Sequence, residues 1–458
     1  GAHALYFPAN NGREPLFIYL VALSVGAFGR TPFAERLPAA LVGALTVPAA
    51  YALGRALFNQ RVGLMGAALV AFTFWPIALS RIGFRAGTLP LVATLSLVCA
   101  IYGWRRRNAW LVALGGALYG LTFYTYLAAR FTPLALFAFL IFWYIARRDS
   151  FPTALWPFVA FVAPAALVAA PLAGLMLAQP DIALGRAEQV SIFSQSVNGG
   201  DLWGTLFHNL LAAPGMFVFR GDALARHNLP GRPIFDPLIG TAFLVGVGLG
   251  LRWVWTRRDL ACALALIWVG VMLLPTALAA DAPHFLRAVG VMPMAFFFPA
   301  LALDALWTVN LPGRWPALHR ALAVVLIAVS LILTGRDYFA RYLGDPDTRF
   351  FFQSAATDLA AQTNTYLGAA HERRVYLDKR LWDSFPSLRF LLNDDDRLRV
   401  FGPGEVLTPG LASEVRVVVW PYEDPRPALA ALPVGALIRA EAGPLYRGDE
   451  EPEPYSLF

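Results

Sequence analysis

Arginines recur in the short polar segments that separate the apolar blocks of this chain. A guanidinium group can hold a phosphate through two parallel hydrogen bonds, so arginines that meet at one place can bind a phosphate or pyrophosphate group. An arginine at a membrane surface also reaches lipid phosphates at little cost, and any one of them is more simply an anchor. As a set, they indicate a site for a phosphate-bearing ligand. The candidates are Arg13, Arg81, Arg85, Arg220, Arg226 and Arg287.

Two carboxylates stand next to these arginines and are candidate general bases. Glu14 follows Arg13 directly, and Asp222 lies two residues after Arg220. A base that takes a proton from a hydroxyl must lie within hydrogen-bond reach of it, which favours carboxylates placed beside the ligand. Asp236, which precedes a proline, is better explained as the N-cap of a helix.

Two histidines, His227 and His284, lie in the same polar segments. Either could bind a metal ion or the phosphate-bearing ligand. No spacing typical of a metal site supports metal binding. We therefore expect no cofactor, while a divalent metal stays possible. No glycine-rich nucleotide loop occurs either, so nothing favours a soluble nucleotide donor.

The amino-acid composition indicates the class of protein to which these residues belong. Of the 458 residues, 58% are hydrophobic and 15% are charged, whereas soluble domains carry about 25% charged residues. This excludes a soluble enzyme and a disordered chain. The net charge of +7 could suggest nucleic acid, but Lys379 is the only lysine among the 37 basic residues, and we expect no nucleic-acid partner.

The apolar blocks predict a polytopic helical membrane protein with about ten spans. Loops rich in arginine fall on one side by parity, and the positive-inside rule makes that side cytoplasmic. They include Arg61, Arg105 to Arg107, Arg147, Arg257 and Arg314. The expected spans lie near 37–57, 62–80, 88–103, 109–128, 131–146, 152–177, 236–254, 260–280, 286–308 and 320–335.

The first apolar stretch runs from Pro15 to Phe28. If it crossed the membrane, the arginine-rich loops could stay cytoplasmic only if the residues before it were cytoplasmic as well. It has about 14 residues, where a span needs about 20. We expect a helix on the outer membrane surface or a re-entrant segment, with a short true span as the alternative.

Three domains follow from these assignments. Residues 1–36 form a first extracytoplasmic loop with the surface helix, and 37–335 form the transmembrane bundle, including a large outer loop at 178–235. Residues 336–458 change to a soluble composition with short β-branched runs at 374–377 and 415–419. They predict a small extracytoplasmic α/β domain.

Several of these segments resemble the GT-C glycosyltransferases of family 39, which include protein O-mannosyltransferases and aminoarabinose transferases. The likeness lies in Asn11 to Leu20, Glu35 to Gly43, Ser80 to Arg85, Gly221 to Gly231 and Asp281 to Arg287, and it covers most of the chain up to about residue 335. Arg13 stands where the family has a basic residue, but Glu14 replaces the first of two prolines. The family's catalytic Asp follows a span that precedes this loop, so the resemblance implies an N-terminally truncated chain whose base lies before Gly1.

The resemblance implies an inverting glycosyltransferase of a bacterial plasma membrane. It would transfer a sugar from a polyprenyl-phosphate donor to a hydroxyl of a lipid, glycan or protein acceptor on the outer face. The arginines, with His227 and His284, would bind the donor phosphate. A transporter or flippase for a lipid-linked sugar is the alternative, since it would use the same arginines and spans without catalysis. Such transporters favour internal repeats and charges near mid-membrane, neither of which is evident.

Overall fold

The computed structural model describes residues 4–7, 12–148, 155–181, 185, 189–309, 317–393, 395–402, 405, 407, 414–420, 437, 439, 441–442 and 456–457. The chain divides into two compact units. One contains Gly1–Gly29 and Phe33–Tyr338, and the other contains Arg30–Pro32 and Phe339–Phe458. The boundaries expected at residues 36 and 335 stay a proposal.

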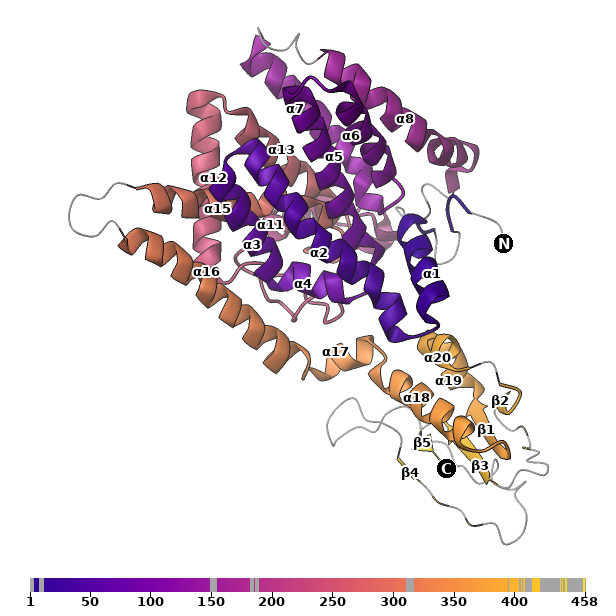
Figure 1. Cartoon of the computed structure of the whole chain (residues 1–458). Coiled ribbons are helices and arrows are strands. Elements are labelled where there is room, and N and C mark those ends of the chain that lie inside the picture. The colour runs from indigo at the N-terminus through magenta and orange to yellow at the C-terminus, as the bar shows by residue number, and fades with distance from the viewer. Residues whose placement is uncertain are drawn as a thin grey trace. The chain divides into compact units, whose positions relative to one another are not determined.

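The first unit is built from helices (Figure 1). They are α1 (Leu16–Phe28), α2 (Pro32–Leu57), α3 (Gln60–Phe72), α4 (Phe74–Arg81), η1 (Arg85–Gly87), α5 (Thr88–Arg105), α6 (Ala109–Thr122), η2 (Leu127–Phe131), α7 (Thr132–Ala146), α8 (Leu155–Ala178), α10 (Gln195–Asn198), α11 (Leu202–Gly215), α12 (Pro237–Arg257), α13 (Leu260–Met272), α14 (Leu274–Ala277), η4 (Val289–Val291), α15 (Met294–Thr308) and α16 (Leu318–Arg336). The helix η5 (Asp337–Tyr342) follows α16 and contains the chain boundary between the two units.

Short polar side chains define where several of these helices begin. The side chains of Asn59, Asn108 and Asp259 each accept a hydrogen bond from a backbone N–H in the first turn of α3, α6 and α13. Asp236 does the same for α12, and Pro237 occupies its first position, as the sequence predicts. These caps satisfy N–H groups that have no partner inside the helix.

Seven helical segments among the described residues are long and apolar enough to cross a membrane, and α3 with α4 would make an eighth. Each of the ten expected spans contains an apolar helix, which confirms a polytopic α-helical fold. α6 and α15 are shorter, with 14 and 15 residues. α1 forms over the first apolar stretch, but its 13 residues rise only about 20 Å, and its place at the surface stays a prediction.

The expected span 62–80 is broken rather than straight. α3 and α4 meet at an angle of 56°. The break lies at Thr73, whose backbone is extended and whose N–H still bonds to Leu69 of α3. Pro76 follows in the first turn of α4, where its missing N–H costs no helical hydrogen bond. The bend carries Arg81, at the end of α4, away from the axis of α3.

Two pairs of the arginine-rich loops meet in the structure. Nη2 of Arg147, after α7, donates to the carbonyl of Arg257 at the end of α12, at 3.3 Å. Nε of Arg61, in α3, lies 2.5 Å from Oδ1 of Asp304 near the end of α15. Helix ends assigned to the same side by parity therefore lie together. Arg314 lies outside the described residues.

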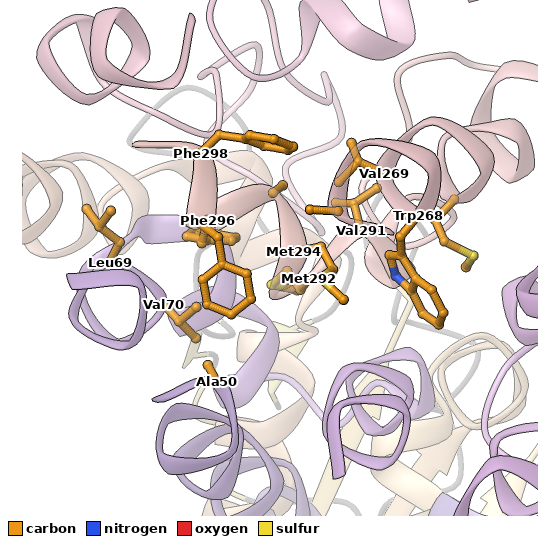
Figure 2. Close-up of a cluster of buried hydrophobic side chains, with 14 of the residues drawn as sticks. Ala50, Leu69, Val70, Trp268, Val269, Val291, Met292, Met294, Phe296 and Phe298 are labelled. Carbon is orange, nitrogen blue, oxygen red and sulfur yellow. The ribbon is translucent and has the colours of Figure 1, made fainter. Parts of the chain in front are cut away.

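Aromatic residues of α15 fill the centre of the first unit. Figure 2 shows Phe296 and Phe298 with side chains of α3 and α13, including Val70 and Trp268. Glycine permits the close approach of α12, because a Cβ on Gly246 would lie 1.8 Å from the carbonyl oxygen of Phe298. Small residues of this kind let membrane helices pack backbone to backbone.

The second unit is the expected α/β structure. Its helices are α17 (Pro346–Phe351), α18 (Ser354–Ala369), α19 (Lys379–Ser384) and α20 (Pro386–Leu391), and its strands are β1 (Arg373–Asp378), β2 (Leu398–Phe401), β3 (Glu414–Val419), β4 (Glu441–Ala442) and β5 (Ser456–Leu457). The sheet order is β2-β1-β3-β5-β4. β1 pairs in parallel with β2 and β3, while β5 is antiparallel to β3 and β4. β1 and β3 coincide with the two predicted runs.

Candidate functional site

The chain before α12 forms a compact turn that carries Asp222 and His227. The N–H of Gly221 donates to the carbonyl of Gly231, and the N–H of Gly231 donates to the carbonyl of Asp222, at 3.1 and 2.9 Å. Nδ2 of Asn228 closes the turn on the same Asp222 carbonyl at 3.1 Å. A Cβ on Gly221 would lie 1.9 Å from the carbonyl oxygen of Arg232, so glycine is required there.

Asp222 is buried, at 2% exposure, and both of its carboxylate oxygens are bound. Oδ1 accepts from the N–H of Leu224 at 2.9 Å, and Oδ2 accepts from the N–H of Phe285 at 2.8 Å. Oδ2 also lies 3.0 Å from Nδ1 of His227. Burial alone would raise the pKa of Asp222, but the hydrogen bonds from His227 and the two N–H groups hold that pKa below its ordinary value. Asp222 is therefore an anion at neutral pH.

His284 faces this pair from the segment between α14 and η4. Its ring centre lies 4.6 Å from that of His227, and its backbone N–H donates to Oγ1 of Thr276 at 2.8 Å. Burial, and next the charge of Arg287, lower the pKa of His284 to about 3, so its imidazole is neutral. Candidate ligand atoms of Asp222, His227 and His284 all lie within 4.8 Å of one another.

Phe84 links this cluster to a second one. The guanidinium of Arg226 lies 4.9 Å from the centre of the Phe84 ring, and the ring of His227 meets Phe84 edge to face at 5.7 Å. The next residue, Arg85, places its Nε 3.3 Å from Oε2 of Glu14. Arg226 therefore contacts the Phe84 ring, while the guanidinium of Arg85 lies 5.6 Å from the centre of the Tyr126 ring.

The second cluster lies where α1 begins. Glu14 is 2% exposed, and the buried Tyr6 lies close enough to feel its charge. Burial, and then Glu14, raise the pKa of the Tyr6 phenol. Gly12 adopts φ +99, and a Cβ there would lie 2.3 Å from Oη of Tyr6. Arg13 is exposed and exchanges two backbone hydrogen bonds with Phe7 at 2.8 and 3.0 Å.

An apolar cavity of about 240 Å³ lies beside both clusters. It is lined mainly by α2, α3, α4 and the start of α5, with Phe17 of α1. Arg81 and Phe84 are part of its lining, and Arg81 brings a charged group to apolar walls. The Arg81 guanidinium also lies 6.0 Å from the centre of the Tyr338 ring.

The structure thus brings most of the predicted site residues into neighbouring groups. Glu14 pairs with Arg85, Asp222 pairs with His227, and His284 lies beside them with Arg287. Arg81 lines the cavity, Arg226 contacts Phe84, and Arg13 adjoins Glu14 in sequence. Arg220 is exposed on the turn and, among the residues that the structure describes, contacts none of the other candidate arginines.

Sequence reasoning missed the residues that position these groups. Tyr6, Phe84 and Thr276 gave no signal, because aromatic and hydroxyl side chains are common everywhere in this chain. Nothing in the sequence distinguishes Arg232 from the other arginines, but its Nε lies 2.8 Å from Oδ2 of Asp337 and fixes the turn to the end of α16.

Comparison with known proteins adds three findings. Residues 12–173 match the family model described as dolichyl-phosphate-mannose-protein mannosyltransferase. No curated protein matches the chain significantly. Several solved structures share the fold.

The structure of ArnT from Cupriavidus metallidurans in the apo state has 15% identity and a TM-score of 0.53, and the match covers 97% of this chain and 87% of that one. ArnT bound to undecaprenyl phosphate gives a TM-score of 0.50 with the same identity and coverage. The apo oligosaccharyltransferase from Archaeoglobus fulgidus has 15% identity and a TM-score of 0.49, and the match covers 70% of this chain. The chain spans about half the length of that protein, 47%.

Proposed function

We propose that this chain is a membrane glycosyltransferase of the GT-C superfamily that transfers a sugar from a polyprenyl-phosphate donor to an acceptor hydroxyl. The family match over residues 12–173 and the fold shared with ArnT support this proposal. The reaction is a single displacement. The hydroxyl oxygen attacks the anomeric carbon from the face opposite the phosphate, the bond to the phosphate oxygen breaks, and the configuration inverts. The polyprenyl phosphate leaves as an anion, and a base takes the hydroxyl proton.

The observation that carries the proposal is the cavity with Arg81 in its lining. An isoprenoid chain needs an apolar groove, and its phosphate needs a cation at the end of that groove. The cavity offers apolar side chains of α2 and α5 together with one guanidinium group. ArnT from Cupriavidus metallidurans, which shares the fold, has been crystallised with undecaprenyl phosphate.

Four further arginines supply positive charge for the phosphate. Arg226 contacts Phe84, which itself lines the cavity, and Arg85 follows Phe84 in the sequence. Arg287 lies close enough to His284 to act on it through its charge, and Arg13 precedes the buried Glu14. Fixed cations in a water-poor site stabilise negative charge as it develops on the departing phosphate. Arg81, Arg85, Arg226, Arg287 and Arg13 are therefore the proposed donor-binding residues.

Glu14 is the better of the two candidate bases. Both oxygens of Asp222 are occupied by donors that hold it as an anion within the turn. Oε2 of Glu14 accepts no hydrogen bond from any residue that the structure describes, although Arg85 lies 3.3 Å away. A carboxylate with a free lone pair can accept a hydroxyl proton, whereas one bound on both oxygens cannot do so without breaking the turn.

The sidedness is part of the same proposal. Parity of the arginine-rich loops would put Arg61, Arg147 and Arg257 in the cytoplasm of a bacterial cell. The donor site and the C-terminal α/β unit would then face outward from the plasma membrane. There a donor that arrives through the lipid replaces a soluble nucleotide, and the acceptor can be a lipid, a glycan or a protein.

The test uses the full chain in lipid nanodiscs with polyprenyl-phosphate mannose as the first probe in a panel of sugars. Release of polyprenyl phosphate is measured by chromatography, in the presence of a membrane extract as acceptor. We expect turnover that falls at least tenfold in Arg81→Ala and stays unchanged in Arg252→Ala, an exposed arginine of α12. The double variant Arg13→Ala with Arg287→Ala should also lose turnover.

The same samples separate an enzyme from a flippase. A flippase would move a labelled polyprenyl-phosphate sugar across a vesicle membrane with the sugar–phosphate bond intact. Intact donor after prolonged incubation, together with transbilayer movement that depends on Arg81, would reject sugar transfer and establish transport.

A further inference from the structure

The ends of α7 and α12 form a cluster of four arginines, Arg147, Arg148, Arg257 and Arg258. Nη2 of Arg147 donates to the carbonyl of Arg257 at 3.3 Å, and Nη1 of Arg258 donates to the carbonyl of Ala146 at 3.4 Å. These two bonds run in opposite directions between the helix ends and hold them together. All four arginines are exposed, so four positive charges lie together on the surface of the first unit.

Helix packing accounts for two of these four arginines. The carbonyls in the last turn of a helix have no partner inside it, and Arg147 and Arg258 each satisfy one such carbonyl on the neighbouring helix. The guanidinium groups of Arg148 and Arg257 instead lie 5.9 Å from the ring centre of Tyr144 and 5.8 Å from that of Trp253. An aromatic ring orients a guanidinium group and leaves its N–H groups available for an anion.

The cluster has little negative charge of its own. No carboxylate that the structure describes pairs with Arg148, Arg257 or Arg258. Asp259 follows Arg258 directly, but its Oδ1 accepts from the N–H of Cys262 at 2.8 Å as the N-cap of α13. Because like charges held at short range repel one another, the cluster fits an anion that brings more than one negative charge.

The surface beside the cluster is apolar and aromatic. On α7, Phe137, Ile141 and Ile145 are exposed at intervals of four residues, so they form one apolar stripe that runs along the helix toward Arg148. On α12, Trp255 is 90% exposed, and tryptophan is enriched at the boundary between membrane and water. An apolar stripe that ends at a cation matches a phospholipid, whose acyl chains lie along the helix and whose phosphate lies at its end.

We propose that the arginine cluster binds one anionic phospholipid with two phosphate groups, of the cardiolipin class. One phosphate contacts Arg148 after α7 and the other contacts Arg257 at the end of α12, while acyl chains lie against the apolar stripe. Basic pockets between membrane helices bind such headgroups on the cytoplasmic side, which is the side predicted for these loops. The site uses none of the residues proposed to bind the sugar donor, so the proposal stands independently of the proposed function.

The test is native mass spectrometry of the full chain, titrated in detergent with cardiolipin, phosphatidylglycerol or phosphatidylcholine. We expect one cardiolipin to stay bound to the wild type, with weaker binding of phosphatidylglycerol and none of phosphatidylcholine. The double variant Arg148→Gln with Arg257→Gln should bind cardiolipin at least about tenfold more weakly, because each basic residue near an anionic lipid adds to the attraction. The matched control, Arg55→Gln with Arg320→Gln, removes two exposed arginines of α2 and α16 and should bind like the wild type.

The double variant keeps both bonds between α7 and α12, so its unfolding temperature without lipid should equal that of the wild type. Cardiolipin should raise the unfolding temperature of the wild type and the control, but not that of the double variant. Equal cardiolipin binding by the double variant and the wild type overturns the proposal. So does wild-type binding of phosphatidylcholine as strong as that of cardiolipin.

The wild type alone supplies a measurement that does not depend on the folding of a variant. Cardiolipin binding should weaken steeply as sodium chloride is raised, since salt screens exposed charges. Cardiolipin binding that does not change with salt overturns the proposal. Displacement of cardiolipin by an equal concentration of inorganic pyrophosphate also overturns it, because the cluster would then bind a soluble anion rather than a lipid.

Discussion

Oε2 of Glu14 lies 3.3 Å from Nε of Arg85, and the glutamate side chain is 2% exposed. The pair joins the residue before α1 to the segment between α4 and α5. A charge this deeply buried depends on its partner, because the cost of removing it from water is offset only while the opposite charge remains.

Breaking this pair should destabilise the first unit. Glu14→Gln leaves the Arg85 cation without its partner, and we expect a loss of about 3 kcal/mol, the usual cost of an uncompensated buried charge. Thermal unfolding in detergent measures the effect. Glu35→Gln, an exposed glutamate of α2, is the control and should leave the unfolding temperature unchanged. Equal unfolding temperatures for both variants would show that the ion pair does not stabilise the fold.

Two arginines that pair with Asp337 should contribute differently to the stability of the fold. The Arg232 side chain is 9% exposed and that of Arg336 is 57% exposed, and each lies 2.8 Å from an Asp337 oxygen. Arg232→Ala removes a buried partner and should cost about 3 kcal/mol, whereas exposed ion pairs contribute about 0–1 kcal/mol. Chemical denaturation of the two variants tests the ranking, and a larger effect of Arg336→Ala would contradict it.

Gly246 and Gly248 provide a matched pair within α12. An added Cβ at Gly246 meets the carbonyl oxygen of Phe298 at 1.8 Å, while one at Gly248 meets nothing within 4 Å. Gly246→Ala must push α12 away from α15 and should lower the unfolding temperature by several degrees. Gly248→Ala should be neutral or stabilising, since alanine favours helix by about 1 kcal/mol. Equal unfolding temperatures for the two variants would contradict the close packing of α12 on α15.

Acid should weaken the C-terminal unit through Asp378. Burial would raise the pKa of this carboxyl, but Arg380 and the backbone N–H groups of Arg380 and Trp420 hold the pKa below its ordinary value. The folded unit therefore binds the proton less readily than the unfolded chain. The stabilisation is complete above the unfolded pKa of about 3.9 and is lost as pH falls through the lower folded value.

Limited proteolysis with pepsin, which is active in acid, measures this loss of stability. Cleavage of the full chain between β1 and β3 is compared at pH values above and below about 3.9. We expect cleavage to increase steeply as the pH falls in the wild type. Asp378→Asn should already be sensitive at the higher pH and show little further change. Asp358→Asn, an exposed aspartate of α18, should behave like the wild type; a pH profile of Asp378→Asn identical to the wild type would exclude the carboxyl as the cause.

The sequence predicted elements whose signal is local. Long apolar runs located the helices, Asp236 and Pro237 located the start of α12, and β-branched runs located β1 and β3. The break at Thr73 was missed because the apolar run continues through it, and β2 was missed because its four residues include an arginine and alternate weakly.

The pairings at the site could not be read from the sequence. Glu14 is 71 residues from Arg85 in the sequence, and His284 is 57 residues from His227. No local spacing encodes such contacts. The residue types were informative, since arginine, carboxylate and histidine marked the right segments. Which carboxylate faces which cation is decided by the packing of separate loops.

Phe84 touches Arg226 and His227, while Arg85, its immediate neighbour, holds Glu14. The two ionic groups are therefore contacted by adjacent residues, whose Cα atoms are about 3.8 Å apart. Inserting a single alanine between these two positions would force one group or the other out of register. The same insertion beside Gly199 and Gly200, where added side-chain atoms meet open space, would be absorbed by the loop.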